Sequence, residues 1–177
     1  MNRGPGQRAG LTTAAVLAQA RELLAEGGSE ALSMRALARR LQVAPNAIYS
    51  HVKDKTELVD ALLDDVLAAV EAPEAESVDP VDGLAAIMTS TYEVLIAHPG
   101  LVPVLLVRQG ARGPNAVRLG VVMDELLARA GVDGPAAAEA RRVLIVHAIG
   151  SAAFATASPD TVIPAAESHG NFARSLH

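Results

Sequence analysis

Histidine, carboxylate and thiol side chains build most catalytic and metal sites, and their spacing in this chain of 177 residues forms none. The histidines lie too far apart for metal-ligand spacing. They are His51, His98, His147, His169 and His177. No glycine-rich phosphate loop follows a strand pattern, and there is no cysteine to supply a thiolate or a disulfide. We therefore expect no enzyme, no metal and no cofactor.

The adjacent acids Asp64 and Asp65 are the nearest approach to a carboxylate pair. Adjacent residues on a helix point in different directions, so the two carboxylates would not meet over one substrate. We interpret them as part of a solvated helix face.

A run of basic residues without acids indicates contact with phosphate groups. No Asp or Glu occurs between Glu30 and Asp54, although the chain has a net charge of −5. The basic residues of this run are Arg35, Arg39, Arg40 and Lys53. Arg35 and Arg39 are four residues apart, so they share one helix face and could straddle a row of phosphates. The alternative is an ordinary solvated face; the lack of acids in an acidic chain favours DNA.

Two short helices are predicted to position these residues. Ser33 is a good N-cap, and Leu37, Ala38 and Leu41 follow it as an apolar stripe at helical spacing. Pro45 suits the first turn of a second helix. This second helix would bury Val43, Ala47, Ile48 and Val52 and expose Asn46, Tyr49, Ser50 and Lys53. Two short helices joined by a turn, the second with a polar outer face, predict a helix-turn-helix.

The segments Ser33-Met-Arg-Ala-Leu-Ala, Val43 and Ile48-Tyr-Ser-His-Val-Lys-Asp-Lys55 resemble the DNA-binding domain of the TetR (tetracycline repressor-like) transcriptional regulators. The resemblance covers roughly Leu11 to Leu63, and the Tyr-x-His-Val-x-x-Lys run lies at the family's distance after the turn. Gln42 stands where the family usually has glycine, which would tighten the turn. The rest of the chain resembles the family only in being helical, as expected for its variable ligand-binding part.

The resemblance implies that the second helix enters the major groove of DNA. The residues assigned to the surface in the groove are Pro45, Asn46 and Ala47, with Tyr49 and Ser50. Asn46 can pair with the donor and acceptor edge of adenine, and Ala47 or Pro45 could touch a thymine methyl group. The expected phosphate contacts are Tyr49, His51 and Lys55 on one strand and Ser33 and Arg35 on the neighbouring strand. The ring of Tyr49 can also pack within the small domain while its hydroxyl faces outward.

Charge and composition divide the chain. Residues 1–55 carry eight Lys or Arg against four acids, and residues 56–177 carry seven against sixteen, so a basic part precedes an acidic one. The expected organisation is a flexible basic arm at 1–10, a three-helix DNA-binding domain at 11–54, a connecting helix at 55–72, and a helical ligand-binding and dimerisation domain at 79–177. Half of the residues are hydrophobic and only 2% are aromatic, which favours an all-α fold.

Apolar periodicity and helix breakers predict the individual helices. A first helix capped by Thr12 or Thr13 would end at Gly27-Gly28. The further helices are expected near residues 54–71, 81–97, 101–109, 115–130, 135–157 and 165–176.

Residues 143–157 are apolar nearly all round. The stretch contains a His and a Ser and is too short to span a bilayer, so no membrane contact is expected. A helix of this kind must be covered on every side, and a second copy of the chain would cover the side that its own domain leaves open. The expected dimer contacts are Ile149, Gly150, Ala153 and Phe154.

A cavity for a small apolar ligand with one or two hydrogen-bonding groups is expected in the C-terminal part. Its predicted lining is Met88, Tyr92, His98, Leu105, Arg108, Met123, Val143 and His147. A lone histidine such as His147 on an apolar helix is more often a core or interface residue than a ligand contact.

We interpret the chain as a cytoplasmic, homodimeric transcriptional repressor that a small ligand releases from a palindromic operator. The cytoplasmic location is expected because the N-terminus lacks an apolar signal run. Two alternatives stay open: a regulator without any inducer, and a helical protein–protein adaptor that carries a vestigial helix-turn-helix.

Overall fold

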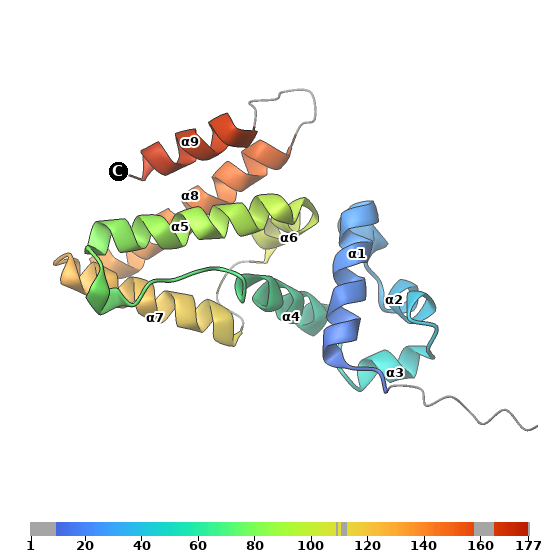
Figure 1. The fold of residues 1–177 in the computed structure, drawn as a ribbon. Coiled ribbons are helices and arrows are strands. Elements are labelled where there is room, and N and C mark those ends of the chain that lie inside the picture. The colour runs from blue at the N-terminus through green and yellow to red at the C-terminus, as the bar shows by residue number, and fades with distance from the viewer. Residues whose placement is uncertain (1–9, 109, 111–112, 158–164, 177) are drawn as a thin grey trace, which may run out of the picture.

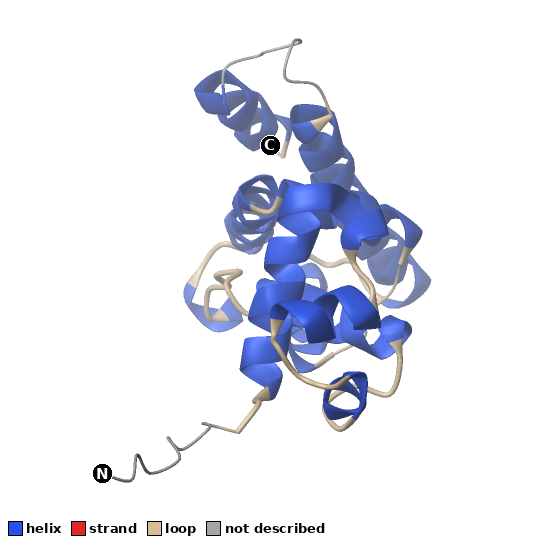
Figure 2. Ribbon diagram, turned by 90° about the vertical axis from the view of Figure 1, so that its right-hand side faces the viewer, coloured by secondary structure: helices blue, strands red, loops and turns tan. Residues whose placement is uncertain are grey.

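The computed structural model describes residues 10–108, 110, 113–157 and 165–176. These residues form helices and loops without any strand, so the predicted all-α class is confirmed (Figure 1, Figure 2). The helices are α1 (Thr13–Ala31), α2 (Met34–Arg40), α3 (Pro45–Tyr49), α4 (Lys55–Leu67), α5 (Pro80–Ala97), α6 (Val102–Val107), α7 (Pro114–Arg129), α8 (Gly134–Thr156) and α9 (Ala165–Ser175). Two 3-10 turns, η1 (Ala75–Ser77) and η2 (Pro99–Leu101), lie between them.

Helices α1 to α3, which we call the head, pack with α4 around one hydrophobic cluster. Side-chain caps start three of these helices: Thr12 caps α1, Ser33 caps α2 and Asp54 caps α4. Helix α3 has no such cap and begins instead with Pro45, whose ring suits the first helical turn. The cluster is made of aliphatic residues that include Val16, Leu24, Leu37, Ile48, Leu58 and Leu62.

Two backbone positions shape the head. The helical conformation of α1 is interrupted at Gly27 and Gly28, and Gly28 has a φ of +64°, so the predicted stop at these glycines is confirmed even though a last turn continues to Ala31. Gln42 has a φ of +55° and is the only non-glycine residue with positive φ in the described part of the chain. Gln42 lies in the turn between α2 and α3. It therefore adopts a left-handed conformation that glycine adopts without steric cost.

Helices α5 to α9, which we call the body, enclose a second cluster. Helix α5 packs against α7 and α8, and α9 lies across α5 and α8 (Figure 1). Two ring contacts attach α9: Phe172 stacks on Tyr92 of α5 at 4.4 Å between ring centroids and on His147 of α8 at 5.3 Å. Helix α4 leads from one cluster to the other, since Leu58 belongs to the first and Leu67 packs against the second.

Helix α4 ends at Leu67, four residues before the predicted end near Glu71. The sequence has no helix breaker before Pro73. The backbone groups of residues 70 and 71 instead form hydrogen bonds with side chains of α7 and α5. Arg118 of α7 donates to the carbonyl oxygen of Val70 at 3.1 Å, and the hydroxyl of Ser90 accepts from the amide of Glu71 at 2.9 Å. The segment after α4 is therefore bound to the body rather than continued as a helix.

No single helix in the described ranges is both long and hydrophobic enough to cross a membrane. The bent pair Pro80–Ala97 and Pro99–Val107 meets that criterion only when its two parts, 98° apart, are taken together.

Candidate nucleic-acid interface

Helix α3 presents a polar outer face, as the sequence predicted. Ile48 is fully buried beneath the helix, while Pro45, Asn46 and Ser50 are exposed. The Tyr49 side chain is 50% exposed, so its ring lies along the surface instead of filling the core. This face is therefore open on the surface of the head.

The nine candidate DNA-binding residues lie at the start of α2, on α3 and the turn that follows it, and at the start of α4. They are Ser33, Arg35, Pro45, Asn46, Ala47, Tyr49, Ser50, His51 and Lys55. Internal hydrogen bonds already hold four of these side chains. Ser33 caps α2, and the Ser50 hydroxyl donates to the carbonyl oxygen of Ala47 at 2.7 Å. The Nδ1 atom of His51 lies 3.1 Å from the Thr13 hydroxyl, and the Lys55 ammonium donates to the carbonyl oxygen of Ser29 at 3.2 Å. These bonds orient the side chains and leave other polar hydrogens exposed.

Arg35, Arg39 and Lys53 supply uncompensated positive charge. All three are exposed, and no carboxylate in the described part of the chain lies within 4.0 Å of their charged groups. Free cationic side chains beside an exposed polar helix suit a row of phosphates.

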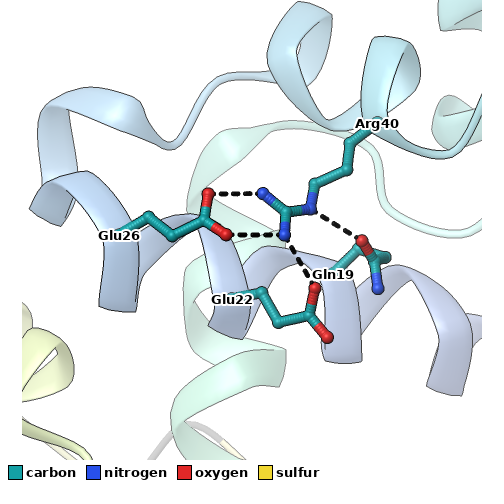
Figure 3. Close-up of polar contacts among 4 residues, drawn as sticks. All are labelled: Gln19, Glu22, Glu26 and Arg40. Atoms are coloured by element: carbon teal, nitrogen blue, oxygen red, sulfur yellow. Dashed lines mark hydrogen bonds and ion pairs between the residues drawn. The ribbon is translucent and has the colours of Figure 1, made fainter.

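Arg40 has a different role, which the sequence pattern did not reveal. Its guanidinium donates to both carboxylate oxygens of Glu26 at 2.5 and 2.7 Å, to Glu22 at 2.9 Å and to Gln19 at 2.8 Å (Figure 3). The hydrogen bond from Arg40 lowers the pKa of Glu26, and the bond to Glu26 raises the pKa of Arg40. Arg40 therefore ties the end of α2 to α1 and is neutralised there.

The carboxylates of α4 also differ from the sequence interpretation. Asp64 is buried and hydrogen-bonds to the start of α7, whereas Asp65 is exposed and pairs with Arg21 of α1. The expectation of a solvated pair is thus wrong for Asp64. The two residues do point apart, as adjacent helical residues must, and the tertiary partner on each side could not be read from the sequence.

The eight predicted ligand-binding residues are not gathered around one cavity. Met88, Tyr92 and Met123 are packed in the core of the body, and Leu105 lies at its edge. The remaining positions are separate. His98 binds the carbonyl oxygen of Val94, Arg108 pairs with Asp60, and the Val143 side chain is 56% exposed. The hydrogen bonds to Asp60 raise the pKa of Arg108.

Only Tyr92 and His147 of that set line a groove of about 520 Å³ between α5, α8 and α9. Gly150 and Phe154, which were predicted as dimer contacts, line it too. The remaining lining residues were not predicted as a site: Val146, Ser151, Ala155, Asn171, Phe172 and Ser175. The signal was absent because α9 has no pattern that shows where it docks. His147 also lies 2.8 Å from the Ser175 hydroxyl, a second contact between α8 and α9.

The outer side of α8 carries an apolar stripe at helical spacing. Val143, Val146 and Phe154 are exposed, Phe154 by 73%, and Gly150 lies between them. Of the predicted dimer contacts, Gly150 and Phe154 belong to this stripe, whereas Ile149 and Ala153 pack partly against the body's own core. A stripe of this kind on a folded domain is typical of an interface.

Parts of the chain are similar to known regulatory proteins. Residues 16–62 match the family model described as bacterial regulatory proteins, tetR family. A curated relative from Saccharopolyspora erythraea, described as an HTH-type transcriptional regulator, is 36% identical over 121 residues. The alignment covers 68% of this chain and 51% of that protein, so the chain spans about half the length of the relative.

Solved structures resemble nearly all of the chain. The TetR family protein ActR of Streptomyces coelicolor, solved in complex with actinorhodin, superposes with a TM-score of 0.78 at 26% identity over 96% of this chain and 87% of ActR. BioQ, solved with its double-stranded DNA operator, gives a TM-score of 0.74 at 20% identity over 94% of this chain and 98% of BioQ, a likeness of fold alone.

Proposed function

Because the chain belongs to the tetR family of bacterial regulatory proteins, we propose that it binds double-stranded DNA and regulates transcription, with α3 in the major groove. The observation that carries this proposal is the exposed polar face of α3 beside Arg35, Arg39 and Lys53, whose charges have no carboxylate partner among the described residues. The protein would bind DNA and catalyse no reaction. It would be located in the cytoplasm, where the DNA is.

Specific roles follow from position and chemistry. Asn46 lies at the start of α3, the end of a recognition helix that reaches base edges, and its amide can both donate to and accept from adenine. Tyr49, His51 and Lys55 bind phosphates on one side of the groove, and Ser33 with Arg35 binds the neighbouring strand.

A second copy of the chain completes the molecule. The apolar stripe of α8 and the groove beside α9 would be covered by the same surface of a partner related by a two-fold axis. Two heads related by that axis read a palindrome, one half-site each. Residues 11–54 would then bind DNA, residues 55–72 would connect the head to the body, and residues 79–177 would form the dimer. The separate hydrophobic clusters of the head and of the body support this division.

A small ligand bound in the body would release the operator by changing the separation of the heads. Support comes from ActR, which has been solved with actinorhodin bound, and from the ion pair between Arg108 and Asp60, which joins the end of α6 to α4. By linkage, DNA binding must weaken ligand affinity by the same factor. The chain is then a repressor that an inducer inactivates.

A DNA mobility-shift assay over a salt series tests the docking face. Two DNA samples are used: a duplex of random sequence, and the tightest-binding site selected from a pool of random duplexes. Arg35→Ala and Lys55→Ala should weaken binding to all sequences alike and each flatten the salt dependence by about one phosphate contact. Arg142→Ala is the matched control, since it removes the same charge from α8, where the partner of Arg142 is Glu139 on the same helix. Full affinity of both head variants at low salt would overturn the proposed face.

A further inference from the structure

Three of the four carboxylates of helix α4 contact three different parts of the chain. Asp60 accepts two hydrogen bonds of 2.6 Å from Arg108, just after α6. Asp64 faces the start of α7, and Asp65 pairs with Arg21 of α1. Asp60 and Asp64 are four residues apart and share the side of α4 that faces the body, whereas Asp65 reaches the head. Helix α4 is thus bonded to both units.

Asp64 is the only carboxylate that is buried among the described residues, and it has no cationic partner there. Its Oδ1 accepts from the amide of Ala116 at 3.0 Å, and its Oδ2 accepts from the backbone amide of Asn115 at 3.3 Å and from the Asn115 side chain at 3.0 Å. The same side-chain amide also donates to the backbone oxygen of Asp64 at 3.2 Å. The charge is balanced by the positive end of a helix and by an amide.

Helix α7 depends on Asp64 for its cap. The N-cap position of α7 is Gly113, which has no side chain to bind the first amides, so a carboxylate from α4 does this instead. The approach is close: a Cβ on Gly113 would overlap the Asp64 carboxylate. A side chain at position 113 would therefore push α4 away from α7.

We propose that Asp64 is a positioning residue that locks α4 onto the start of α7 and so fixes the distance between the two heads of the dimer. The inference rests on the proposed function, that is, on a dimer that binds DNA. In such a dimer α8 lies at the two-fold axis, α7 packs on α8, and α4 packs on α7 and leads to the head. If α4 slid along α7, a buried charge would lose its hydrogen bonds, so the lock resists that motion.

The spacing between half-sites measures this lock directly. One added base pair moves a half-site by about 3.4 Å along the DNA and turns it by about a tenth of a turn. Dimer affinity is measured for a selected palindrome and for copies with one or two base pairs inserted or deleted at its centre. Wild-type protein should prefer one spacing. Asp64→Asn keeps nearly the same size but places an amide against the amides of α7. It should lower the ratio of affinity for the preferred spacing to affinity for the other spacings about threefold or more.

Asp65→Asn is the matched control, because it removes a neighbouring carboxylate whose partner, Arg21, lies in the head. It should keep the wild-type spacing profile. Base preference within each half-site should be the same in all three proteins. Asn115→Ala, which removes only the side-chain share of the contact, serves as a milder second variant should Asp64→Asn lose its helical circular dichroism.

The outcomes separate the lock from the proposed function. A wild-type protein that binds no DNA overturns the proposed function and this inference with it. A wild-type protein that binds but tolerates every spacing overturns only the lock. The lock is also overturned if the spacing profiles of Asp64→Asn and Asn115→Ala keep the wild-type shape, even at lower affinity, since a residue that serves stability alone changes affinity at all spacings equally.

Discussion

Gly100 lies so close to Leu24 that a Cβ on the glycine would stand 2.6 Å from the leucine carbonyl oxygen. Leu24 belongs to α1 in the head, and Gly100 belongs to η2, which follows α5 of the body. The next residue, Leu101, is buried in the cluster of the head. The two units therefore meet backbone to backbone at this point, in addition to the contacts that α4 makes.

Gly100→Ala should force the head and the body apart by a few tenths of an ångström or more. Overpacking of this kind costs about 1–3 kcal/mol, and operator affinity should fall with it because the head shifts. Urea unfolding and DNA titration of the same samples test this. Gly120→Ala is the control: its Cβ would meet only the Arg141 side chain at 3.5 Å, and alanine should stabilise the helix by about 0.5–1 kcal/mol. Equal stability and affinity for Gly100→Ala and wild type would contradict the expected clash.

Asn46→Ala should relax base preference at one position in each half-site, at a cost of about 1–3 kcal/mol for the lost pair of hydrogen bonds. Selection of sites from random duplexes by wild type and variant shows the change. Lys53→Ala, an exposed neighbour without a base-reading role, should weaken binding without altering the selected sequence. Identical selected sites for wild type and Asn46→Ala would mean that Asn46 reads no base.

The local parts of this structure could be predicted from the sequence, and the reason is physical. Caps such as Ser33, the proline that opens α3 and the inward position of Ile48 depend on residues a few positions away. The helix-turn-helix, the all-α class and most helix ends therefore followed from periodicity and breakers. The polar face of α3 followed in the same way.

Contacts between distant residues could not be predicted. The sequence shows Arg40 in a basic run, but not that it meets Glu26 of another helix, and it shows Asp64 beside Asp65, but not that only Asp64 meets α7. The groove beside α9 depends on the contact between Phe172 and Tyr92. These residues are far apart in the sequence, so no local pattern predicts that they meet. Each of these contacts is set by how helices pack, which a single sequence does not state.

Gln42→Gly should stabilise the protein by about 0.5–1 kcal/mol. The left-handed conformation costs a residue with a Cβ about 1–2 kcal/mol. Glycine removes this cost, but it also makes the unfolded chain more flexible, which offsets part of the gain in stability. Gln42→Ala keeps the Cβ and should bring no such gain. Urea unfolding of the three proteins decides the question, and a glycine variant no more stable than the alanine variant would show that the turn is not strained.

The contact between Glu26 and Arg40 should be sensitive to acid. The pKa of Glu26 is lowered in the folded protein, so its contribution to stability is complete above about pH 4.5, the ordinary value, and is lost as pH falls through the lower folded value. Glu26→Gln should therefore be less stable than wild type near neutral pH, with a difference that shrinks in acid. Glu30→Gln, exposed in the same region, should match wild type throughout. A gap for Glu26→Gln that stays constant with pH would rule out the ionised contact.

Gly150→Leu should lower dimer stability and operator affinity together. A Cβ built on Gly150 meets no atom within 4 Å beyond its neighbours and its own helix backbone, so a side chain at this position starts in open space on the surface that a partner would cover. Ala138→Leu, exposed nearer the start of α8, is the control and should leave the dimer intact. The measurement is sedimentation alongside DNA titration. A wild-type protein that stays monomeric at micromolar concentration and still binds a palindrome tightly would refute the proposed interface.

The two tyrosines give the unlabelled protein two optical probes. The chain has no tryptophan, so Tyr49 and Tyr92 dominate its near-ultraviolet absorbance and fluorescence. Tyr49 is half exposed on α3, whereas Tyr92 is 1% exposed and stacks on Phe172. A water-soluble quencher reaches the first and is excluded from the second. If DNA covers α3, the quencher loses access to Tyr49, and if α9 loosens, the quencher gains access to Tyr92. Quenching therefore distinguishes an event in the head from one in the body without altering a residue.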